Sequence, residues 1–241
     1  MKMDKSYRTA AVVLAAGSGK RMNAGVKKQY MEIAGKPVLY YSLKAFEESF
    51  IDEVVLVVSQ DEVEQVEESY VNQYGFHKVS RIVAGGKERY HSVACGLRAV
   101  HPDCDFVFIH DSARPMLTQE ILQNVYREVQ KEGACVVGVL SKDTVKIADE
   151  QGYVSVTPNR SLVWNVQTPQ VFSYPLVHRA YEELLQKEQE LLKAGVQITD
   201  DAMVVEQLAH HKVKLVEGSY ENIKITTPED VQIAERYLQS R

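Results

Sequence analysis

The sequence predicts an α/β fold, namely a doubly wound, mostly parallel sheet with one protruding β-arm. Short runs of apolar, β-branched residues alternate with segments of helical periodicity, a pattern typical of parallel sheets buried on both faces. Several of these runs end in loops rich in glycine and charged residues. The alternation breaks at residues 143–172, where two short strand patterns flank a turn.

The expected elements follow one another in a regular order. Apolar runs too short for helices predict strands at residues 10–14, 54–58, 79–83, 106–109 and 134–140. Helical patterns lie between them at residues 37–49, 61–74, 90–99 and 118–131, with Pro37 at a helix start and Thr118 as an N-cap. Crossovers between parallel strands are right-handed, so we expect a Rossmann-like sheet that binds ligands beyond the carboxyl ends of its strands.

The break in the alternation predicts the β-arm, at about residues 141–172. Strand patterns at 144–147 and 153–156 flank Glu150-Gln151-Gly152, a hairpin signal, and Trp164 follows in an apolar stretch. A hairpin with exposed apolar positions rarely stands alone, so we expect the arm to pack on a partner subunit. An extension that covers the chain's own sheet is the alternative.

The remainder of the chain returns to helices and short strands. Helices are expected at residues 176–192, from the cap at 199–201 to about 209, and at 229–238 behind Pro228, with β runs at 213–217 and 223–226. No linker, repeat or low-complexity tract divides the sequence. We therefore expect residues 1–241 to form a single domain.

Composition and charge argue against several classes of protein. The chain has 241 residues, of which 45% are hydrophobic and 25% charged, the balance of an ordinary globular protein. A formal net charge of -5 argues against nonspecific nucleic-acid binding through a basic surface. No apolar run is long enough for a membrane span, and we expect no signal peptide at the polar start. The odd number of cysteines, without metal-ligand spacing, predicts reduced thiols and a cytoplasmic protein.

The first predicted strand runs into a loop with almost no side chains, since residues 10–22 read AAVVLAAGSGKRM. The small residues that could expose backbone N–H groups to a ligand are Ala15, Ala16, Gly17 and Gly19. A P-loop needs Ser or Thr where Arg21 stands, and a dinucleotide fingerprint needs Gly where Met22 stands. We expect a polyphosphate ligand, with a plain glycine-rich turn as the alternative.

Two further strand ends carry polar residues that could contact the same ligand. After the third strand, Gly85-Gly86 permits close backbone approach and Ser92 can bond a base or ribose edge, although a turn before a helix would look alike. After the fourth strand, Asp111 suits Mg²⁺ or substrate hydroxyls and Arg114 suits a phosphate. An Asp–Arg ion pair that merely closes this loop is the alternative.

Other charged residues give weaker signals. Arg160 in a polar loop is more often a solvated charge, and Lys224 within an apolar β run would need an anion if it pointed inward. The histidines form no metal-ligand spacing, and no Ser–His–Asp order is recognisable. We therefore expect no metal site built from protein side chains alone.

Taken together, these motifs resemble those of the 2-C-methyl-D-erythritol 4-phosphate cytidylyltransferase family. The matching segments are LAAGSGKRM (14–22), KKQY (27–30), AGGKERYHSV (84–93), HDSARP (110–115), DTVK (143–146), QTPQ (167–170), TDDA (199–202) and NIKITTPEDV (222–231). The resemblance implies transfer of CMP from CTP to 2-C-methyl-D-erythritol 4-phosphate, with release of pyrophosphate, in isoprenoid precursor synthesis. It also implies Mg²⁺ or another divalent cation, held mainly through the CTP phosphates, and a homodimer joined by the β-arm.

The resemblance implies a role for individual residues as well. CTP would contact Ala15, Ala16, Gly17, Gly19, Gly86 and Ser92. The acceptor would be held by Asp111, Arg114, Thr168 and Lys224, and by Thr144 and Arg160 from the partner's arm. Arg21 and Lys28 would stabilise the transition state at the α-phosphate, with Arg160 and Lys224 as the other catalytic cations.

Two positions depart from the family's pattern, and two other functions would use the same loops. Lys27 stands where proline is frequent, and Lys87 where an acidic residue is common. A ribitol 5-phosphate cytidylyltransferase is one alternative, and only the resemblance of LAAG and HDSARP favours methylerythritol over it. The other is a CTP-binding regulatory module without catalysis. Such a module would need the glycine loops, but not Lys28, Arg114, Arg160 and Lys224 together.

Overall fold

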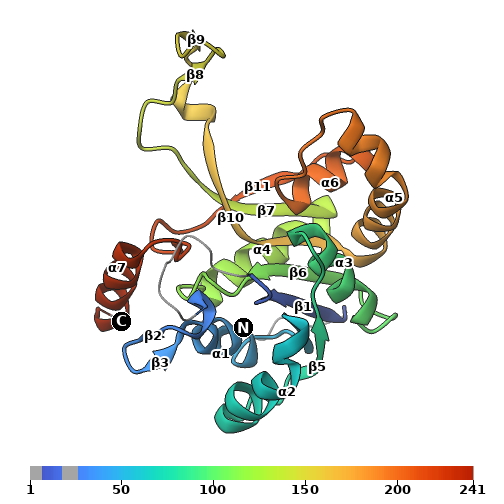
Figure 1. Cartoon of the computed structure of the whole chain (residues 1–241), viewed down its shortest axis with the longest axis vertical. Coiled ribbons are helices and arrows are strands. Elements are labelled where there is room, and N and C mark those ends of the chain that lie inside the picture. The colour runs from blue at the N-terminus through green and yellow to red at the C-terminus, as the bar shows by residue number, and fades with distance from the viewer. Residues whose placement is uncertain (1–6, 18–26, 241) are drawn as a thin grey trace.

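The computed structural model describes residues 7–17 and 27–240 and has the expected sheet (Figure 1). Within these residues the central sheet has seven strands in the order β11-β7-β10-β6-β1-β4-β5. The strands are β1 (Thr9–Leu14), β4 (Glu53–Val58), β5 (Val79–Ala84), β6 (Phe106–Asp111), β7 (Ala134–Leu140), β10 (Trp164–Ser173) and β11 (Lys214–Glu217). Only β10 is antiparallel to its neighbours among these described strands, so the prediction of a doubly wound, mostly parallel sheet is confirmed.

Helices cover both faces of this sheet. They are α1 (Val38–Glu47), α2 (Val63–Val66), α3 (Arg89–Ala99), α4 (Gln119–Glu132), α5 (Tyr174–Lys193), α6 (Asp201–Leu208) and α7 (Pro228–Gln239). Ala11 and Val13 of β1 belong to one buried cluster with residues of α1 and α4, whereas Ala10 and Val12 belong to another with residues of α3 and α5. Successive side chains of a strand point to opposite faces of the sheet. A continuous apolar run therefore places apolar side chains on both faces, and each face is buried under helices.

Two short hairpins and an irregular helical segment complete the chain. One hairpin joins β2 (Glu32–Ile33) to β3 (Lys36–Pro37). The helix expected at 61–74 is broken into a 3-10 turn at Gln60–Glu62, then α2, then a π-helical turn at Glu67–Asn72. None of the helices among the described residues combines the length and apolar character that crossing a bilayer requires.

The sheet changes its direction of growth beside β1. The chain passes from β1 to β4 and β5 on one side and then returns to β6 on the other. In register, Leu14 lies opposite Val57 of β4 and Asp111 of β6. The Ala15 N–H donates to Val57 O at 2.7 Å, and the Ser112 N–H donates to Leu14 O at 3.0 Å. The loops after these strands therefore meet at one edge, which is where open α/β sheets bind ligands.

The β-arm is shorter than the sequence predicts. Its hairpin, β8 (Ile147–Ala148) and β9 (Val154–Val156), stands away from the sheet at the end of two connecting segments (Figure 1). The expected boundary near residue 172 is wrong, because β10 enters the sheet and pairs with β6 and β7. Gln167–Phe172 are all buried, so this part of the expected arm belongs to the core.

The strand expected at residues 223–226 is also wrong, because this described segment has no regular secondary structure and belongs to no sheet. The Ile225 N–H donates to Ala113 O at 2.8 Å, which attaches the segment to the loop after β6. The Ile225 side chain is buried in a cluster with Ile33, Val38 and residues of α7. Burial against helices thus produced a strand-like apolar pattern without a neighbouring strand.

Gly96 of α3 packs against the sheet where a side chain does not fit. A Cβ at this position would lie 2.4 Å from Val12 Cγ1 and 3.0 Å from Val57 Cγ2. We expect Gly96→Ala to lower the free energy of unfolding by about 1–3 kcal/mol, despite the higher helix propensity of alanine. Urea unfolding measures this change, with Cys95→Ala on the same helix as the control. An unchanged midpoint for Gly96→Ala would contradict the close packing.

Candidate active site

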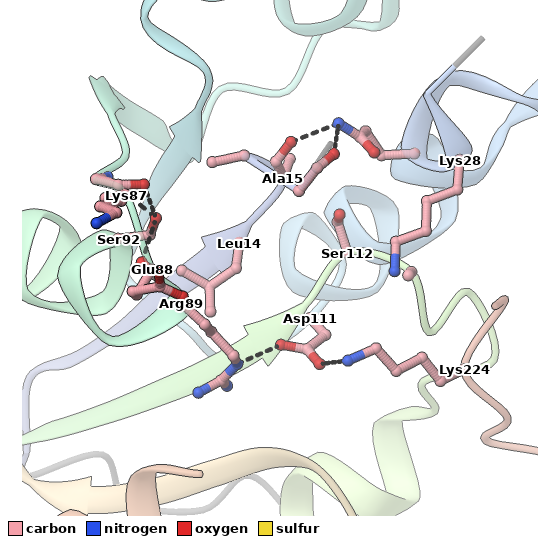
Figure 2. Close-up of a pocket in the computed structure, with 15 residues that line it drawn as sticks. Leu14, Ala15, Lys28, Lys87, Glu88, Arg89, Ser92, Asp111, Ser112 and Lys224 are labelled. Carbon is pink, nitrogen blue, oxygen red and sulfur yellow. Dashed lines mark hydrogen bonds and ion pairs between the residues drawn. The ribbon is translucent and has the colours of Figure 1, made fainter. Parts of the chain in front are cut away.

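A pocket lies at the carboxyl ends of β1 and β6, beside the loop that follows β5 (Figure 2). Its volume is about 330 Å³. The residues that line it are Leu14, Ala15, Ala16, Gly17, Lys28, Gln29, Gly86, Lys87, Glu88, Arg89, Ser92, Asp111, Ser112, Ala113 and Lys224. Loops from separate parts of the sequence thus converge on one cavity, as the strand order predicts.

The first glycine-rich loop forms one wall of the pocket. Ala15, Ala16 and Gly17 line the cavity. The Gln29 side-chain amide donates to Ala15 O at 2.6 Å and to Gly17 O at 3.2 Å, and Gln29 is almost fully buried. Gln29 therefore fixes the shape of this loop, a role that the sequence did not suggest. Gly19 and Arg21, two predicted contacts, lie outside the described residues.

The second glycine loop forms the facing wall, and its glycines are required by close packing. A Cβ on Gly85 would lie 2.7 Å from both Ala16 Cβ and Ser92 Oγ, and one on Gly86 would lie 2.3 Å from His91 Cβ. The Ser92 hydroxyl accepts a hydrogen bond from the Gly86 N–H at 3.1 Å. Ser92 is buried, so in this structure it shapes the loop through Gly86.

Asp111 stands between two cations on one side of the pocket (Figure 2). Its Oδ2 accepts from Lys224 Nζ at 2.6 Å, and its Oδ1 accepts from Arg89 Nε at 3.2 Å. Burial alone would raise the pKa of Asp111, but Arg89 and Lys224 outweigh it and hold that pKa well below its usual range. From the sequence, Lys224 was expected to need an anion if it pointed inward. Asp111 is that anion.

Arg89 also connects the pocket to α6. Its Nη1 and Nη2 donate to the two carboxylate oxygens of Asp201, each at 2.8 Å, and the Tyr181 hydroxyl donates to the same carboxylate. Asp201 is fully buried. Burial would lower the pKa of Arg89, but Asp201 and Asp111 raise it well above its ordinary value, so the guanidinium stays charged.

The sequence did not identify this Arg89–Asp201 pair, although both residues lie in motifs that carry the family resemblance. The two positions are 112 residues apart, so no local spacing relates them. The available signal was an arginine at a helix start three residues after Gly86, close to the expected ligand.

Thr168 and His110 support Asp111 from behind. The Thr168 hydroxyl oxygen accepts from the Asp111 backbone N–H at 3.1 Å and lies 3.0 Å from His110 Nδ1. His110 Nε2 lies 3.2 Å from Arg114 O, which can only accept, so Nε2 carries the proton and Nδ1 accepts from Thr168. Burial lowers the pKa of His110 to about 4, so the ring is neutral at pH 7.

The Arg114 guanidinium is hydrogen-bonded to the backbone of neighbouring segments. Its Nη1 donates to Asn222 O at 2.7 Å and its Nη2 donates to Val166 O at 3.3 Å, while its buried Nε has no hydrogen-bond partner. The alternative expected for this loop was an ion pair between Asp111 and Arg114. Asp111 is bonded instead to Arg89 and Lys224.

Thr144 and Arg160 lie on the arm, outside the pocket of their own chain. Both residues are exposed, and Arg160 Nη1 donates to Lys142 O at 3.3 Å. Neither residue lines the cavity. Their predicted contact with the acceptor would therefore need a second chain.

The described residues contain no group of three or more His, Cys, Asp or Glu side chains that could hold a metal ion. In the pocket, both oxygens of Asp111 already accept from cations. The pocket therefore offers few free protein oxygens to a metal ion. This fits a divalent cation that is held mainly by a ligand's phosphate oxygens.

The fold and the pocket together define a class of protein. Two glycine loops and several cations at the switch point of a doubly wound sheet are the arrangement of a nucleotidyltransferase. The sequence profile of the 2-C-methyl-D-erythritol 4-phosphate cytidylyltransferases matches residues 9–240, and the chain belongs to this family. The resemblance stated from the motifs is thus confirmed.

Individual relatives agree with the family assignment. The 2-C-methyl-D-erythritol 4-phosphate cytidylyltransferase of Lachnoclostridium phytofermentans is 48% identical over 231 residues, which is 96% of each chain. That of Alkaliphilus oremlandii is 44% identical over 240 residues, 99% of this chain and 98% of its own. The crystal structure of 4-diphosphocytidyl-2C-methyl-D-erythritol synthase from Anaerococcus prevotii is 35% identical, with a TM-score of 0.84 and coverage of 97% of this chain and 96% of that chain.

The buried Arg89–Asp201 pair gives a stability prediction. Asp201→Asn replaces one acceptor oxygen by an N–H₂ group that faces a guanidinium or a hydroxyl donor. We expect the free energy of unfolding at pH 7 to fall by about 1–3 kcal/mol, because donors that bonded the buried carboxylate then face an N–H₂ group, while Arg89 keeps its bond to Asp111. Urea unfolding tests this, with the exposed Asp61→Asn as control. A loss for Asp201→Asn no larger than that of the control would contradict the buried pair.

The environment of His110 gives a pH prediction. The pKa of His110 is about 4 in the folded chain, below the ordinary histidine value of about 6.5 that holds in the unfolded chain, so the unfolded chain binds the extra proton between these values. The contribution to stability is complete above pH 6.5 and is lost as the pH falls toward 4, by about 3 kcal/mol in total. Imidazole proton NMR measures the folded-state pKa. Titration of the His110 ring near pH 6.5 would contradict the prediction.

Proposed function

We propose that this chain transfers CMP from CTP to 2-C-methyl-D-erythritol 4-phosphate, giving 4-diphosphocytidyl-2-C-methyl-D-erythritol and pyrophosphate. The observation that carries the proposal is the pocket itself, because its glycine walls share one cavity with Lys28, Arg89 and Lys224 in a chain that belongs to this cytidylyltransferase family. The family match also favours methylerythritol phosphate over ribitol 5-phosphate as the acceptor.

The reaction is a displacement at the α-phosphorus of CTP. A phosphate oxygen of the acceptor forms a new P–O bond, the bond to the bridging oxygen of the β-phosphate breaks, and pyrophosphate leaves with that electron pair. A phosphate monoester is largely a dianion at pH 7, since its second pKa is about 6, so no side chain needs to remove a proton. His110 is consistent with this view, because it is buried behind Asp111 and does not line the pocket.

The main obstacle is the approach of two anions. Lys28 lines the pocket beside the first glycine loop, where it would contact the CTP phosphates with Arg21. Lys224 lies on the other side with Asp111, where its ammonium would meet the acceptor's phosphate while the Asp111 carboxylate accepts from the acceptor's hydroxyls. Fixed cations stabilise charge that develops in the transition state without reorganising.

A divalent cation such as Mg²⁺ would complete this charge balance. When bound, it neutralises phosphate charge between the reacting groups. The phosphate oxygens of CTP would hold it, because both oxygens of Asp111 already accept from Arg89 and Lys224. We expect EDTA to abolish pyrophosphate release and added Mg²⁺ to restore it.

We infer that the chain acts as a homodimer joined by its arm. The arm exposes large apolar side chains, namely Ile147, Tyr153, Val154, Val156 and Leu162. Exposed apolar positions on a hairpin favour a partner surface, and a second chain would also bring Thr144 and Arg160 to the acceptor. Sedimentation at micromolar concentration tests this, and a monomeric mass would remove the role of Arg160 in the partner's pocket.

We also infer a location in the cytoplasm. The described cysteines are all unpaired. Burial raises the pKa of the Cys104 and Cys135 thiols to about 12, so they are poor nucleophiles and behave as small core residues. Cell fractionation tests the location.

Pyrophosphate release with CTP and Mg²⁺ is the experiment that tests the function. We expect release with 2-C-methyl-D-erythritol 4-phosphate and little with ribitol 5-phosphate. Release with ribitol 5-phosphate alone would keep the chemistry and change the acceptor. CTP binding without release in either case would favour a regulatory module.

Lys28 and Arg21 give the mutational prediction for this reaction. We expect Lys28→Ala and Arg21→Ala each to lower kcat by about 10²–10³-fold, because each removes charge stabilisation at the α-phosphate. CTP binding, measured by titration, should weaken far less. Lys131→Ala, an exposed lysine on α4, is the matched control. Near-wild-type turnover in either variant would contradict the assigned roles.

A further inference from the structure

Lys28 enters the pocket on a single short turn. This turn is η1, a 3-10 helix at Lys28–Tyr30, and Lys27 precedes it. Its own backbone bonds are few: the Tyr30 N–H donates to Lys27 O at 2.9 Å, and the Met31 N–H donates to Lys28 O at 3.3 Å. Because a 3-10 turn of this length is weakly stabilised by itself, contacts from neighbouring elements must decide where it sits.

One carboxylate holds both ends of this turn. Glu62, at the end of the 3-10 turn Gln60–Glu62, accepts from Lys27 Nζ through Oε1 at 2.8 Å. Its Oε2 accepts from the Tyr30 hydroxyl at 3.1 Å. The Glu62 side chain is only 12% exposed and that of Lys27 only 30%. Water therefore screens this ion pair less than it screens a surface pair.

Further contacts connect the same turn to the wall of the pocket. Lys27 Nζ also donates to Ser59 Oγ at 3.0 Å, and Ser59 Oγ donates to Ala16 O at 3.5 Å. The Tyr30 ring stacks on Tyr70, with 4.9 Å between ring centroids. Gln29, which lies between Lys28 and Tyr30 in this turn, donates hydrogen bonds to the first glycine loop.

We propose that Glu62 is a positioning residue for Lys28. Lys27, Gln29 and Tyr30 are all directed to neighbouring elements, and Lys28 lines the pocket (Figure 2). By holding Lys27 and Tyr30 together, Glu62 fixes the turn so that the Lys28 ammonium faces the phosphate-binding region. This inference rests on the proposed function, because it gives Lys28 its role in the transfer. It also explains how a lysine at position 27 is accommodated beside Lys28.

The first test does not depend on activity. In Glu62→Gln, we expect the backbone amides of Tyr30 and Met31 to exchange with deuterium about tenfold faster than in the wild type, because the turn opens locally more often. A peptide that spans residues 27–33 reports this change. Glu64→Gln, at an exposed position of α2 close by, is the matched control and should leave the exchange unchanged.

The second test separates positioning from binding. We expect Glu62→Gln to lower kcat about tenfold with the KM for CTP within about twofold, because misplacement of a transition-state group costs rate more than affinity. Lys27→Met should act alike, and Lys27→Arg, which keeps the charge, should retain kcat. The double variant Lys27→Met/Glu62→Gln should be no slower than Glu62→Gln, since both changes break one interaction.

The possible outcomes distinguish this inference from the proposed function. If the wild type releases no pyrophosphate with either polyol phosphate, the proposed function fails and the exchange result alone decides whether Glu62 fixes the turn. Unchanged exchange at 27–33 in Glu62→Gln overturns the inference, even in an active enzyme. A lower kcat with a lower thermal midpoint and no local change in exchange also overturns it, because Glu62 would then be merely structural.

Discussion

The carboxylate of Asp111 is the interaction on which the rest of the site depends. It binds Arg89 from the start of α3 and Lys224 from the segment before α7, and Arg89 in turn binds Asp201 at the start of α6. Segments that are far apart in the sequence are thus brought to one edge of the sheet by charge. Because these groups are largely buried, each one needs its partners, and the set is held as a unit.

The sheet supplies the place for this network. Parallel pairing sets Leu14 of β1 opposite Asp111 of β6, so the beginning of the first glycine loop and the carboxylate share one edge. The two loops can approach each other only because Gly85 lacks a side chain, since a Cβ there would lie 2.7 Å from Ala16 Cβ. Backbone geometry therefore forms the cavity, and side-chain charge determines what it can hold.

The sequence was sufficient for the layers of the fold and for most of the cavity's walls. Apolar runs and glycine loops are local signals, so the strands, Gly86 and Asp111 could be predicted from them. The Arg89–Asp201 pair could not, because its members are distant in sequence and each looks like an ordinary helix-terminal charge.

The errors have a common physical cause. An apolar pattern in the sequence indicates that residues are buried. It does not indicate whether they pack against a strand, a helix or a loop. Ile225, in the segment 223–226, is buried against helices and a loop, although the pattern of the segment resembled a strand. Gln167–Phe172 are buried in the sheet, although they follow a hairpin that projects from it. A pattern alone could not distinguish these surfaces.

The strand β10 connects the base of the arm with the backbone that supports the pocket. It begins with Trp164 at the base of the arm, and farther along it carries Thr168, whose hydroxyl meets the backbone of Asp111. Between Val166 and Gln170 the register with β7 shifts, and there the Thr168 carbonyl accepts from Asn222 instead. A chain that binds the arm therefore also affects β10, the strand that supports the groups proposed to bind the acceptor. By thermodynamic linkage, a substrate that tightens association through the arm must itself be bound more tightly by the associated form, and by the same factor.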